Sequence, residues 1–309
     1  MVSIVYSERF LEHETDCGHP ESPERLQAIL DYLEKTSFFK RYDIEVVAPE
    51  KIDEKTLELV HLLAYIQQLK LLSSKERTLS SDNPFNKNTF EIASLACAAA
   101  FTAAKKSIEA NSFSFALVRP PGHHAGKAFF QGFCYLNNIA YAVRRIQKEK
   151  QLKKALIVDF DLHHGNGTQD IFYSDDSVYY LSLHQDPSFT FPFHSGFEEE
   201  NNFHIKNIPL GEGTGDRNYL ELFKKAVSEA VEEFKPEIIG VSAGFDIYFA
   251  DAAVGSRLEI RETKTFEEIG KIIRESAEKN NCPVFGVLEG GYYLRKLGEN
   301  FSSLLTGFL

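Results

Sequence analysis

The stretch ALIVDFDLHHGNG at residues 155–167 decides the fold, because a short apolar run passes directly into a loop of carboxylates and imidazoles. Three other apolar runs end in the same manner: 114–118 before RPPGHHAG (119–126), 238–243 before GFD (244–246), and 284–288 before EGGYY (289–293). Uninterrupted runs of this length are typical of parallel strands that are buried on both faces. Sites in open α/β sheets form outside the carboxyl ends of such strands. The sequence therefore predicts that the four polar loops converge at one edge of a sheet.

Apolar runs alternate with helical periodicity along the whole chain. We expect further strands at 2–6, 44–47, 178–183 and 204–208, and helices at 22–33, 56–72, 89–110, 133–150, 219–234 and 266–278. This alternation predicts a single α/β domain over residues 1–309, with a mostly parallel multi-stranded sheet and helices on both faces. The connections at 184–203 and 245–265 are long, which favours a functional role for both.

The composition excludes several classes of protein. The 309 residues are 43% hydrophobic, which is enough for one large core. A net charge of −11 argues against direct recognition of nucleic acid. No stretch approaches the roughly 20 apolar residues of a membrane span, and the amino terminus MVSIVYSERF lacks the pattern of a signal peptide. We therefore expect no membrane partner. The four cysteines are scattered without a C-x-x-C pair, which is typical of a reducing compartment, so we expect a cytoplasmic protein.

Asp161, His163 and Asp246 form a candidate metal site. Alternation after the strand directs Asp159, Asp161 and His163 to one side, and carboxylate oxygens with an imidazole nitrogen suit a zinc-like divalent ion. Three protein ligands leave a position open for water, as a hydrolytic site requires. The competing interpretation is a polar strand end whose aspartates cap the following helices. Complementary groups at four strand ends favour the metal site.

His123, His124 and Tyr292 are candidates for proton transfer and oxyanion binding. A histidine titrates near neutral pH, so it can take a proton from a metal-activated water and return it to a leaving group. A tyrosine hydroxyl can donate a hydrogen bond to the oxyanion. Taken singly, the histidines are as typical of an ordinary loop and the tyrosine of a packed core. Together with the metal ligands, they predict a metal-dependent hydrolase.

The motifs that carry this chemistry resemble those of a known family. They are, in order, HPESPER (19–25), VH (60–61), RPPGHHA (119–125), GFCYLNN (132–138), DFDLHHGNGTQ (159–169), SLH (182–184), VSAGFD (241–246) and LEGGYYL (288–294). The chain resembles the zinc-dependent histone deacetylases and their prokaryotic relatives, the acetoin-utilisation-type and acetylpolyamine amidohydrolases. The resemblance covers nearly the whole chain. It implies the arginase/deacetylase α/β fold, with a parallel sheet of about eight strands.

The resemblance also implies which ions are bound. It assigns one zinc ion to Asp161, His163 and Asp246, and it makes Tyr292 the donor to the substrate carbonyl. Relatives bind monovalent cations near this site as well, so a structural potassium ion is expected. The positions that match its ligands are Asp159, Asp161, His163, Ser182 and Leu183.

For the tandem histidines the resemblance implies two different roles. His124 takes the position of the general base and acid, and His123 that of an electrostatic partner hydrogen-bonded to Asp159. Asn166 stands where some relatives have Asp and those of the class II type have Asn. An Asn orients His124 without adding negative charge, so it raises the pKa of that histidine less than an Asp would.

A narrow channel for an aliphatic amide is a further implication of the resemblance. Phe133 and Phe191 correspond to its walls, and Gly132 to the point where the backbone approaches the substrate. Asp82 corresponds to a rim carboxylate that holds substrate backbone. The sequence departs from the family at this rim, because the gate position is a small residue, Ala253, and FPFHSG (191–196) replaces the usual Phe-Pro-Gly-Thr-Gly.

Three alternatives share part of this pattern. A binuclear manganese ureohydrolase would need carboxylates at the positions of Gly165 and Tyr248, so its second ion would lack ligands. A metal-binding scaffold without activity is disfavoured because every catalytic position is filled. A non-haem iron site prefers two histidines and one carboxylate, which is the reverse of this set, although ferrous loading of a hydrolase stays open.

Within the deacetylases the sequence leaves the substrate open. Acetyl-lysine in proteins is the expected substrate, and an acetylated polyamine or another small acylamide is the alternative. A polyamine enzyme needs an acidic gatekeeper for the distal ammonium, and Asp251 and Glu259 are candidates. Few residues follow the last motif, so we expect a single-domain enzyme of the prokaryotic type without a targeting tail. The sequence predicts no particular oligomeric state.

Overall fold

Eight strands form one sheet in the computed structural model, which describes residues 2–309. Their order is β2-β1-β3-β8-β7-β4-β5-β6, and every neighbouring pair is parallel. The strands are β1 (Ser3–Val5), β2 (Glu45–Val47), β3 (Ser114–Ala116), β4 (Ala155–Asp159), β5 (Val178–Gln185), β6 (Ile205–Leu210), β7 (Ile238–Ala243) and β8 (Val284–Leu288). Because all strands run the same way, the loops that follow them lie at the same edge of the sheet.

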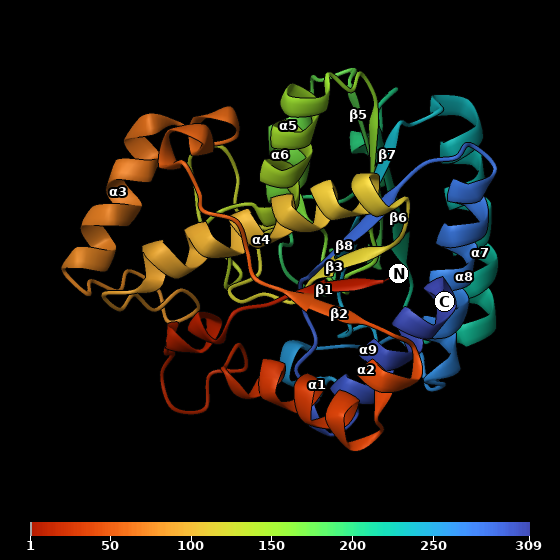
Figure 1. The fold of residues 1–309 in the computed structure, drawn as a ribbon, viewed down its shortest axis with the longest axis horizontal. Helices are drawn as coiled ribbons and strands as arrows, with labels where there is room; N and C mark the ends of the chain where they lie inside the picture. Colours follow the sequence, from red (N-terminus) through yellow and green to blue (C-terminus); the bar gives the residue numbers. More distant parts are fainter. Residues whose placement is uncertain (1) are drawn as a thin grey trace.

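The direction of each crossover decides which face of the sheet its helix covers. Right-handed connections put helices that advance along the sheet on one face and helices that return on the other. The advancing helices are α4 (Thr89–Ala110), α5 (Asn138–Lys150) and α6 (Asn166–Phe172); the returning ones are α1 (Glu24–Lys35), α7 (Asp216–Phe234) and α8 (Lys264–Glu278). Figure 1 shows the two groups on opposite sides of the strands, and α9 (Leu294–Phe308) packs against both α1 and α8.

The core is apolar on both sides of the sheet. Every residue of β4, β7 and β8 is buried, as expected for strands covered on both faces. The small residues of α4, including Ala96, Ala99 and Ala103, are fully buried where this helix meets α5 and β8. The predicted α/β class with a parallel sheet and helices on both faces is therefore confirmed.

The helix expected at 56–72 was wrong in its middle. A 3-10 turn at Glu54–Leu59 ends before Val60, and α3 (Leu63–Ser74) begins after a break. The break lets the buried ring of His61 bridge two loops: its Nδ1 lies 2.9 Å from the Gly126 carbonyl oxygen, and its Nε2 accepts from the Asn137 amide at 3.0 Å. These tertiary hydrogen bonds outweigh the local helical periodicity.

The helix expected at 133–150 begins five residues later, at Asn138. The side chain of Asn137 caps it by accepting a hydrogen bond from the Ala140 amide at 3.0 Å. Phe133 instead has a φ of +68° and belongs to the preceding loop. Helices α6 and α9 and the four-residue helix α2 (Phe38–Arg41) were not predicted from the sequence.

The structure also describes the two features that bear on membrane insertion and on disulfide formation. No helix within residues 2–309 combines the length and the apolar character needed to cross a lipid bilayer. The four cysteines are unpaired; Cys17 is exposed and Cys97, Cys134 and Cys282 are buried.

Candidate active site

The loops after β4 and β7 bring Asp161, His163 and Asp246 together at the carboxyl edge of the sheet. His163 Nδ1 lies 3.3 Å from Asp161 Oδ1 and 3.3 Å from Asp246 Oδ2. All three side chains are buried, and one ligand atom from each lies within 4.8 Å of the others. Residues from two different strand ends thus form one cluster of two carboxylates and an imidazole.

This cluster fits a divalent cation. Asp246 Oδ2 is buried and makes no hydrogen bond of acceptable geometry, although His163 Nδ1 lies 3.3 Å away, and a buried carboxylate oxygen of this kind is costly unless a cation balances it. Burial, and then the neighbouring Asp161 carboxylate, raises the pKa of Asp246. Burial lowers the pKa of His163, but its contacts with the two carboxylates outweigh it and raise that pKa to about 10. The carboxylates thus attract positive charge strongly, and two oxygens with one nitrogen are a ligand set that zinc accepts.

Glycines permit the close approach of the two carboxylates. The Gly290 amide donates to Asp161 Oδ2 at 2.7 Å, and the Leu162 amide donates to Asp246 Oδ1 at 3.1 Å. A Cβ at Gly290 would lie 2.4 Å from Asp246 Oδ2 and 2.6 Å from Asp161 Oδ2. A Cβ at Gly244 would lie 2.2 Å from Asp161 Oδ2. Neither position therefore has space for a side chain.

The tandem histidines after β3 have different partners. His123 Nδ1 lies 3.2 Å from Asp159 Oδ2, and His124 Nδ1 lies 2.9 Å from Asn166 Oδ1. Burial lowers the pKa of His123, but Asp161 and Asp159 outweigh it and raise that pKa to about 10. Burial, together with His123 and His163, holds the pKa of His124 well below its usual range. The carboxylates thus favour the protonated form of His123, whereas burial favours the neutral form of His124.

Two residues around the histidines escaped the sequence analysis. The Tyr180 hydroxyl donates to Asp159 Oδ2 at 2.9 Å. Glu289, fully buried at the start of EGGYY, accepts from the Gly122 amide at 2.7 Å and the His123 amide at 3.1 Å through its Oε2. A carboxylate immediately after an apolar strand was a signal for Glu289, whereas nothing in the sequence distinguishes Tyr180 from other strand tyrosines.

Tyr292 lies in the loop after β8 between aromatic and cationic neighbours. Its ring centroid is 5.7 Å from that of Phe133 and 4.6 Å from the guanidinium carbon of Arg25. Burial raises the pKa of Tyr292 well above its usual range, although Arg25 opposes the shift. The phenol is therefore protonated and able to donate a hydrogen bond near neutral pH.

A cavity of about 300 Å³ leads to this cluster. Its lining contains Asp161 and His163, both tandem histidines and Tyr292. The other lining residues are Asp82, Pro121, Gly132, Phe133, Phe191, Phe193, Ala253 and Val254. All five residues expected to form the substrate channel thus border the same cavity as the candidate catalytic groups.

Gly132 lies close against the His124 ring in the wall of the cavity. Its φ is +53°, and a Cβ there would lie 2.4 Å from the His124 ring. Phe191 packs edge-on against that ring, with centroids 4.8 Å apart. At the mouth, Phe193 is 62% exposed and Ala253 is also exposed, so the rim is more open than the floor.

Neither gatekeeper candidate lies at the mouth. Asp251 is only 1% exposed and bonds to backbone amides, so it is wrong as a rim carboxylate. Glu259 forms an ion pair with Arg261 and does not border the cavity. The acidic side chain at the mouth is Asp82, which is exposed.

The residues expected around a monovalent cation lie on β4, β5 and the loop after β4. Asp159 and Ser182 pair in register across the two strands, and both are fully buried. The Ser182 hydroxyl is 2.8 Å from His184 Nδ1, and Asp159 Oδ1 accepts from the Asp161 amide at 3.1 Å. Leu183 is fully buried beside them.

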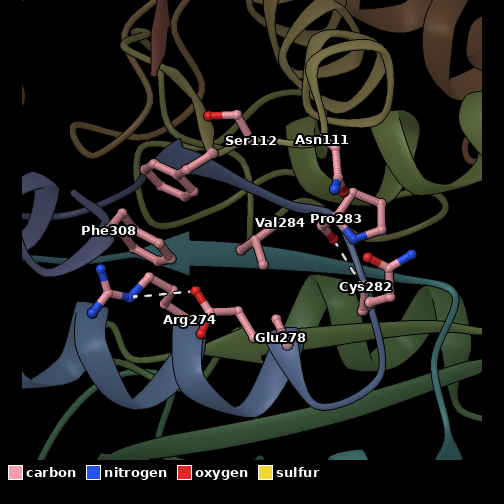
Figure 2. A pocket seen from close by; sticks show the side chains of 11 residues that line it. Asn111, Ser112, Arg274, Glu278, Cys282, Pro283, Val284 and Phe308 are labelled. Carbon is pink, nitrogen blue, oxygen red and sulfur yellow. Dashed lines mark hydrogen bonds and ion pairs between the residues drawn. The ribbon is translucent and has the colours of Figure 1, made fainter. Parts of the chain in front are cut away.

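A second cavity, of about 280 Å³, lies at the opposite edge of the sheet (Figure 2). Phe308 stacks on Phe113 there, with ring centroids 3.6 Å apart, and Arg274 forms an ion pair with Glu278. Cys282 contributes to the wall. Among the residues that border this cavity, none is a histidine and the one carboxylate is paired.

Comparison with known proteins relates the whole chain to one family. A model of the histone deacetylase domain matches residues 19–308. The chain is 35% identical over 297 residues to a probable deacetylase of Archaeoglobus fulgidus, with 94% of this chain and 81% of that protein covered. It is 34% identical over 284 residues to a histone deacetylase-like amidohydrolase of Pseudomonas aeruginosa, with 89% and 73% covered.

Solved structures share the fold. The crystal structure of the HDA15 HD domain superimposes with a TM-score of 0.89 at 30% identity, covering 98% of this chain and 89% of that one. An acetylpolyamine aminohydrolase from Burkholderia pseudomallei superimposes with a TM-score of 0.86 at 24% identity, covering 100% and 98%. At that identity the second likeness is one of fold alone.

Proposed function

Because the chain belongs to the histone deacetylase family and is a deacetylase that hydrolyses amides, we propose that it removes acetyl groups from lysine side chains of proteins with the help of one zinc ion. The observation that carries this proposal is the cavity of about 300 Å³, whose lining combines Asp161, His163, the tandem histidines and Tyr292. We further propose that residues 1–309 form the one catalytic domain.

Zinc would be held by Asp161, His163 and Asp246. When bound, it would lower the pKa of a water molecule and polarise the acetyl carbonyl. The support for this ligand set is the buried cluster itself and the unpartnered Asp246 Oδ2. The same set would accept ferrous iron, and metal analysis of the purified protein distinguishes the two ions.

His124 would transfer the proton. Its Nδ1 donates to Asn166 Oδ1, which leaves Nε2 with a free lone pair. Since burial holds the pKa of His124 below its usual range, the ring is neutral and ready to accept a proton from water. As the C–O bond forms and the amide C–N bond breaks, His124 would give this proton to the leaving amine.

His123 and Tyr292 would act on charge without transferring a proton. His123 donates through Nδ1 to Asp159, and its ring lies 4.0 Å from that of His124, centroid to centroid. The Tyr292 phenol would donate a hydrogen bond to the oxyanion of the tetrahedral intermediate. This contribution is larger in the transition state than in the ground state, so it would raise kcat.

The rim favours a peptide over a small cation. Phe191, Phe193 and Ala253 form an open and largely apolar mouth with Asp82 beside it. A carboxylate at the rim can accept hydrogen bonds from the amides of a substrate peptide. Asp82 can also pair with a distal ammonium, so an acetylated polyamine is the second candidate.

Acetate release by the zinc-loaded protein tests the two candidates side by side. An acetyl-lysine peptide and an N-acetylated polyamine would be compared, each with wild type and with Asp82→Asn. We expect kcat/KM to be higher for the peptide, and Asp82→Asn to raise KM for the peptide. Preference for the polyamine would replace the lysine proposal by the second candidate. Activity on neither, with zinc bound, would contradict both.

Two further parts of the proposal concern the setting of the enzyme. Potassium would bind near Asp159, Asp161, His163, Ser182 and Leu183, where buried oxygen atoms are concentrated. A cytoplasmic location is supported by the four unpaired cysteines. Activity measured in potassium against lithium salts at constant ionic strength would test the first point.

A further inference from the structure

We propose that Asp251 is a positioning residue for Tyr292: its carboxylate fixes the backbone that carries the phenol. This inference rests on the proposed function, which makes Tyr292 the hydrogen-bond donor to the oxyanion. Asp251 lies five residues after the candidate metal ligand Asp246 and does not border the cavity. Its role would therefore be exerted through the main chain of another loop.

The geometry of Asp251 is that of a clamp on two successive amides. Its Oδ2 accepts from the Tyr292 amide at 2.6 Å and from the Tyr293 amide at 3.0 Å. The carboxylate is 1% exposed, so water does not compete for these bonds. Two bonds to one oxygen fix the peptide plane between the two tyrosines, and with it the direction in which the Tyr292 side chain leaves the backbone.

Arg25 holds the same loop from the other direction. Its Nε donates to the Gly291 carbonyl at 2.7 Å, and its Nη2 donates to the Glu289 carbonyl at 2.5 Å. The loop between these anchors contains Gly291 at a φ of +120°. Because glycine can adopt many backbone conformations, this loop needs hydrogen bonds to hold it in one of them. Arg25 therefore fixes carbonyls before Tyr292, and Asp251 fixes the amides at and after it.

Asp251 also connects Tyr292 to the channel wall. It immediately precedes the 3-10 turn Ala252–Val254, whose residues Ala253 and Val254 border the cavity. The Val254 carbonyl oxygen lies 3.3 Å from His163 Nε2. A single side chain thus joins the backbone of the donor tyrosine to a segment of the channel wall.

The clamp needs an acceptor oxygen at this point but not a charge. Asp251 Oδ1 is buried without a partner, and burial raises the pKa of the carboxyl to about 7. An asparagine could make both observed bonds through its one carbonyl oxygen. Asp251→Asn is therefore the conservative variant, whereas Asp251→Ala removes both bonds and Asp251→Ser keeps polarity but is shorter.

Steady-state kinetics of the zinc-loaded enzyme on its better substrate test the inference. We expect Asp251→Ala to lower kcat by about 10²-fold, the order of effect that follows a misplacement of about 1 Å in an active site. KM and zinc content should stay within about twofold, and Asp251→Asn should restore kcat to within about threefold of wild type. Glu259→Gln, in the same loop but outside the cavity, is the matched control and should leave kcat unchanged.

A double-mutant cycle separates positioning from general structure. On a Tyr292→Phe background, Asp251→Ala should change kcat by less than about twofold, because the group that it positions is gone. An equal loss on both backgrounds, or a loss of zinc, would overturn the inference. If Asp251→Ala does not fold, Asp251→Ser is measured in the same cycle with the same criteria.

The two proposals fail in different ways. Full activity of Tyr292→Phe would contradict the donor role of Tyr292 and hence the proposed mechanism. A strong loss in Tyr292→Phe together with full activity of folded Asp251→Ala would leave that mechanism standing and overturn the positioning role of Asp251 alone.

Discussion

The two ends of β8 lie beside cavities of similar size but opposite chemistry. Before the strand, Cys282 and Pro283 border the cavity of about 280 Å³ in Figure 2, with stacked phenylalanines and one ion pair. After the strand, Tyr292 lines the cavity of about 300 Å³, and Glu289 accepts a hydrogen bond from the amide of His123, which also lines it. Histidines and buried carboxylates surround this second cavity. The apolar strand itself is buried throughout. The size of a cavity therefore indicates little about function, and the chemical groups that line the cavity determine what it can bind.

The direction of the chain explains the difference. Helices that follow parallel strands run back across the sheet, so α5, α6 and α9 begin at the carboxyl edge, whereas α4 and α8 end at the amino edge. The loops at the carboxyl edge also supply amide donors to the buried carboxylates, as Gly290 does for Asp161 and Gly122 for Glu289. The buried carboxylates at the carboxyl edge therefore have partners in these loops.

The largest expected difference between the edges lies in metal binding. Asp246→Ala or His163→Ala removes one of three ligands, so zinc content should be lost and kcat/KM should fall by at least about 10³-fold, as when the main electrostatic stabilisation of a transition state is removed. Zinc per protein would be measured by mass spectrometry alongside acetate release. Cys282→Ser at the amino edge is the control and should change neither. Retention of full zinc in either ligand variant would contradict the assigned ligand set.

A smaller loss is expected when the carboxylates are displaced but retained. In Gly290→Ala the new Cβ would lie 2.4 Å from Asp246 Oδ2, so the carboxylate must move. Zinc affinity should fall about 10- to 100-fold, as for changes to groups that orient metal ligands. Gly211→Ala, at the carboxyl end of β6 with nothing within 4 Å of the added Cβ, should bind zinc like wild type. Competition with a chelator would measure both affinities.

Acid should destabilise the fold through His61 behind the carboxyl edge. Burial lowers the pKa of His61 to about 4, against about 6.5 in the unfolded chain, so the unfolded state binds more protons between these values. The free energy of unfolding should therefore decrease by about 3 kcal/mol for this one group as the pH falls from about 6.5 to about 4. Chemical denaturation at several pH values would measure the slope.

A matched variant isolates this contribution. His61→Gln removes the titrating group, so its pH slope should be shallower than that of wild type by about one proton. Equal slopes for wild type and His61→Gln would contradict the assignment to His61.

The smallest effect is expected at the amino edge. Arg274 and Glu278 lie 3.9 Å apart with side chains 33% and 69% exposed, so Arg274→Ala should change the free energy of unfolding by less than about 1 kcal/mol. Since this pair lies across the sheet from the site, kcat should not change. A clear loss of kcat, measured on the acetyl-lysine peptide, would show that the two edges are coupled.

Hydrophobic periodicity in the sequence predicted most of the helices and strands, and the polar residues after the apolar runs predicted which edge of the sheet carries the site. The four runs before the polar loops are the apolar strands β3, β4, β7 and β8, although β3 is shorter than its run. Local pattern failed where tertiary bonds compete with it, as at His61, which breaks the helix expected at 56–72. Phe133 was also misplaced, because its positive φ depends on the packing of the channel and not on its neighbours in sequence.

By itself, the sequence determined the fold class and the identity of the candidate metal and catalytic residues, because strand ends in a parallel sheet must meet at one edge. Only the tertiary structure revealed that Glu289 holds the loop of the tandem histidines, that Tyr180 supports Asp159, and that Asp251 is a buried clamp and not a gatekeeper at the rim. The physical reason is that hydrogen bonds to backbone amides join residues far apart in the chain. Such bonds depend on how loops pack, and no spacing along the sequence specifies that packing.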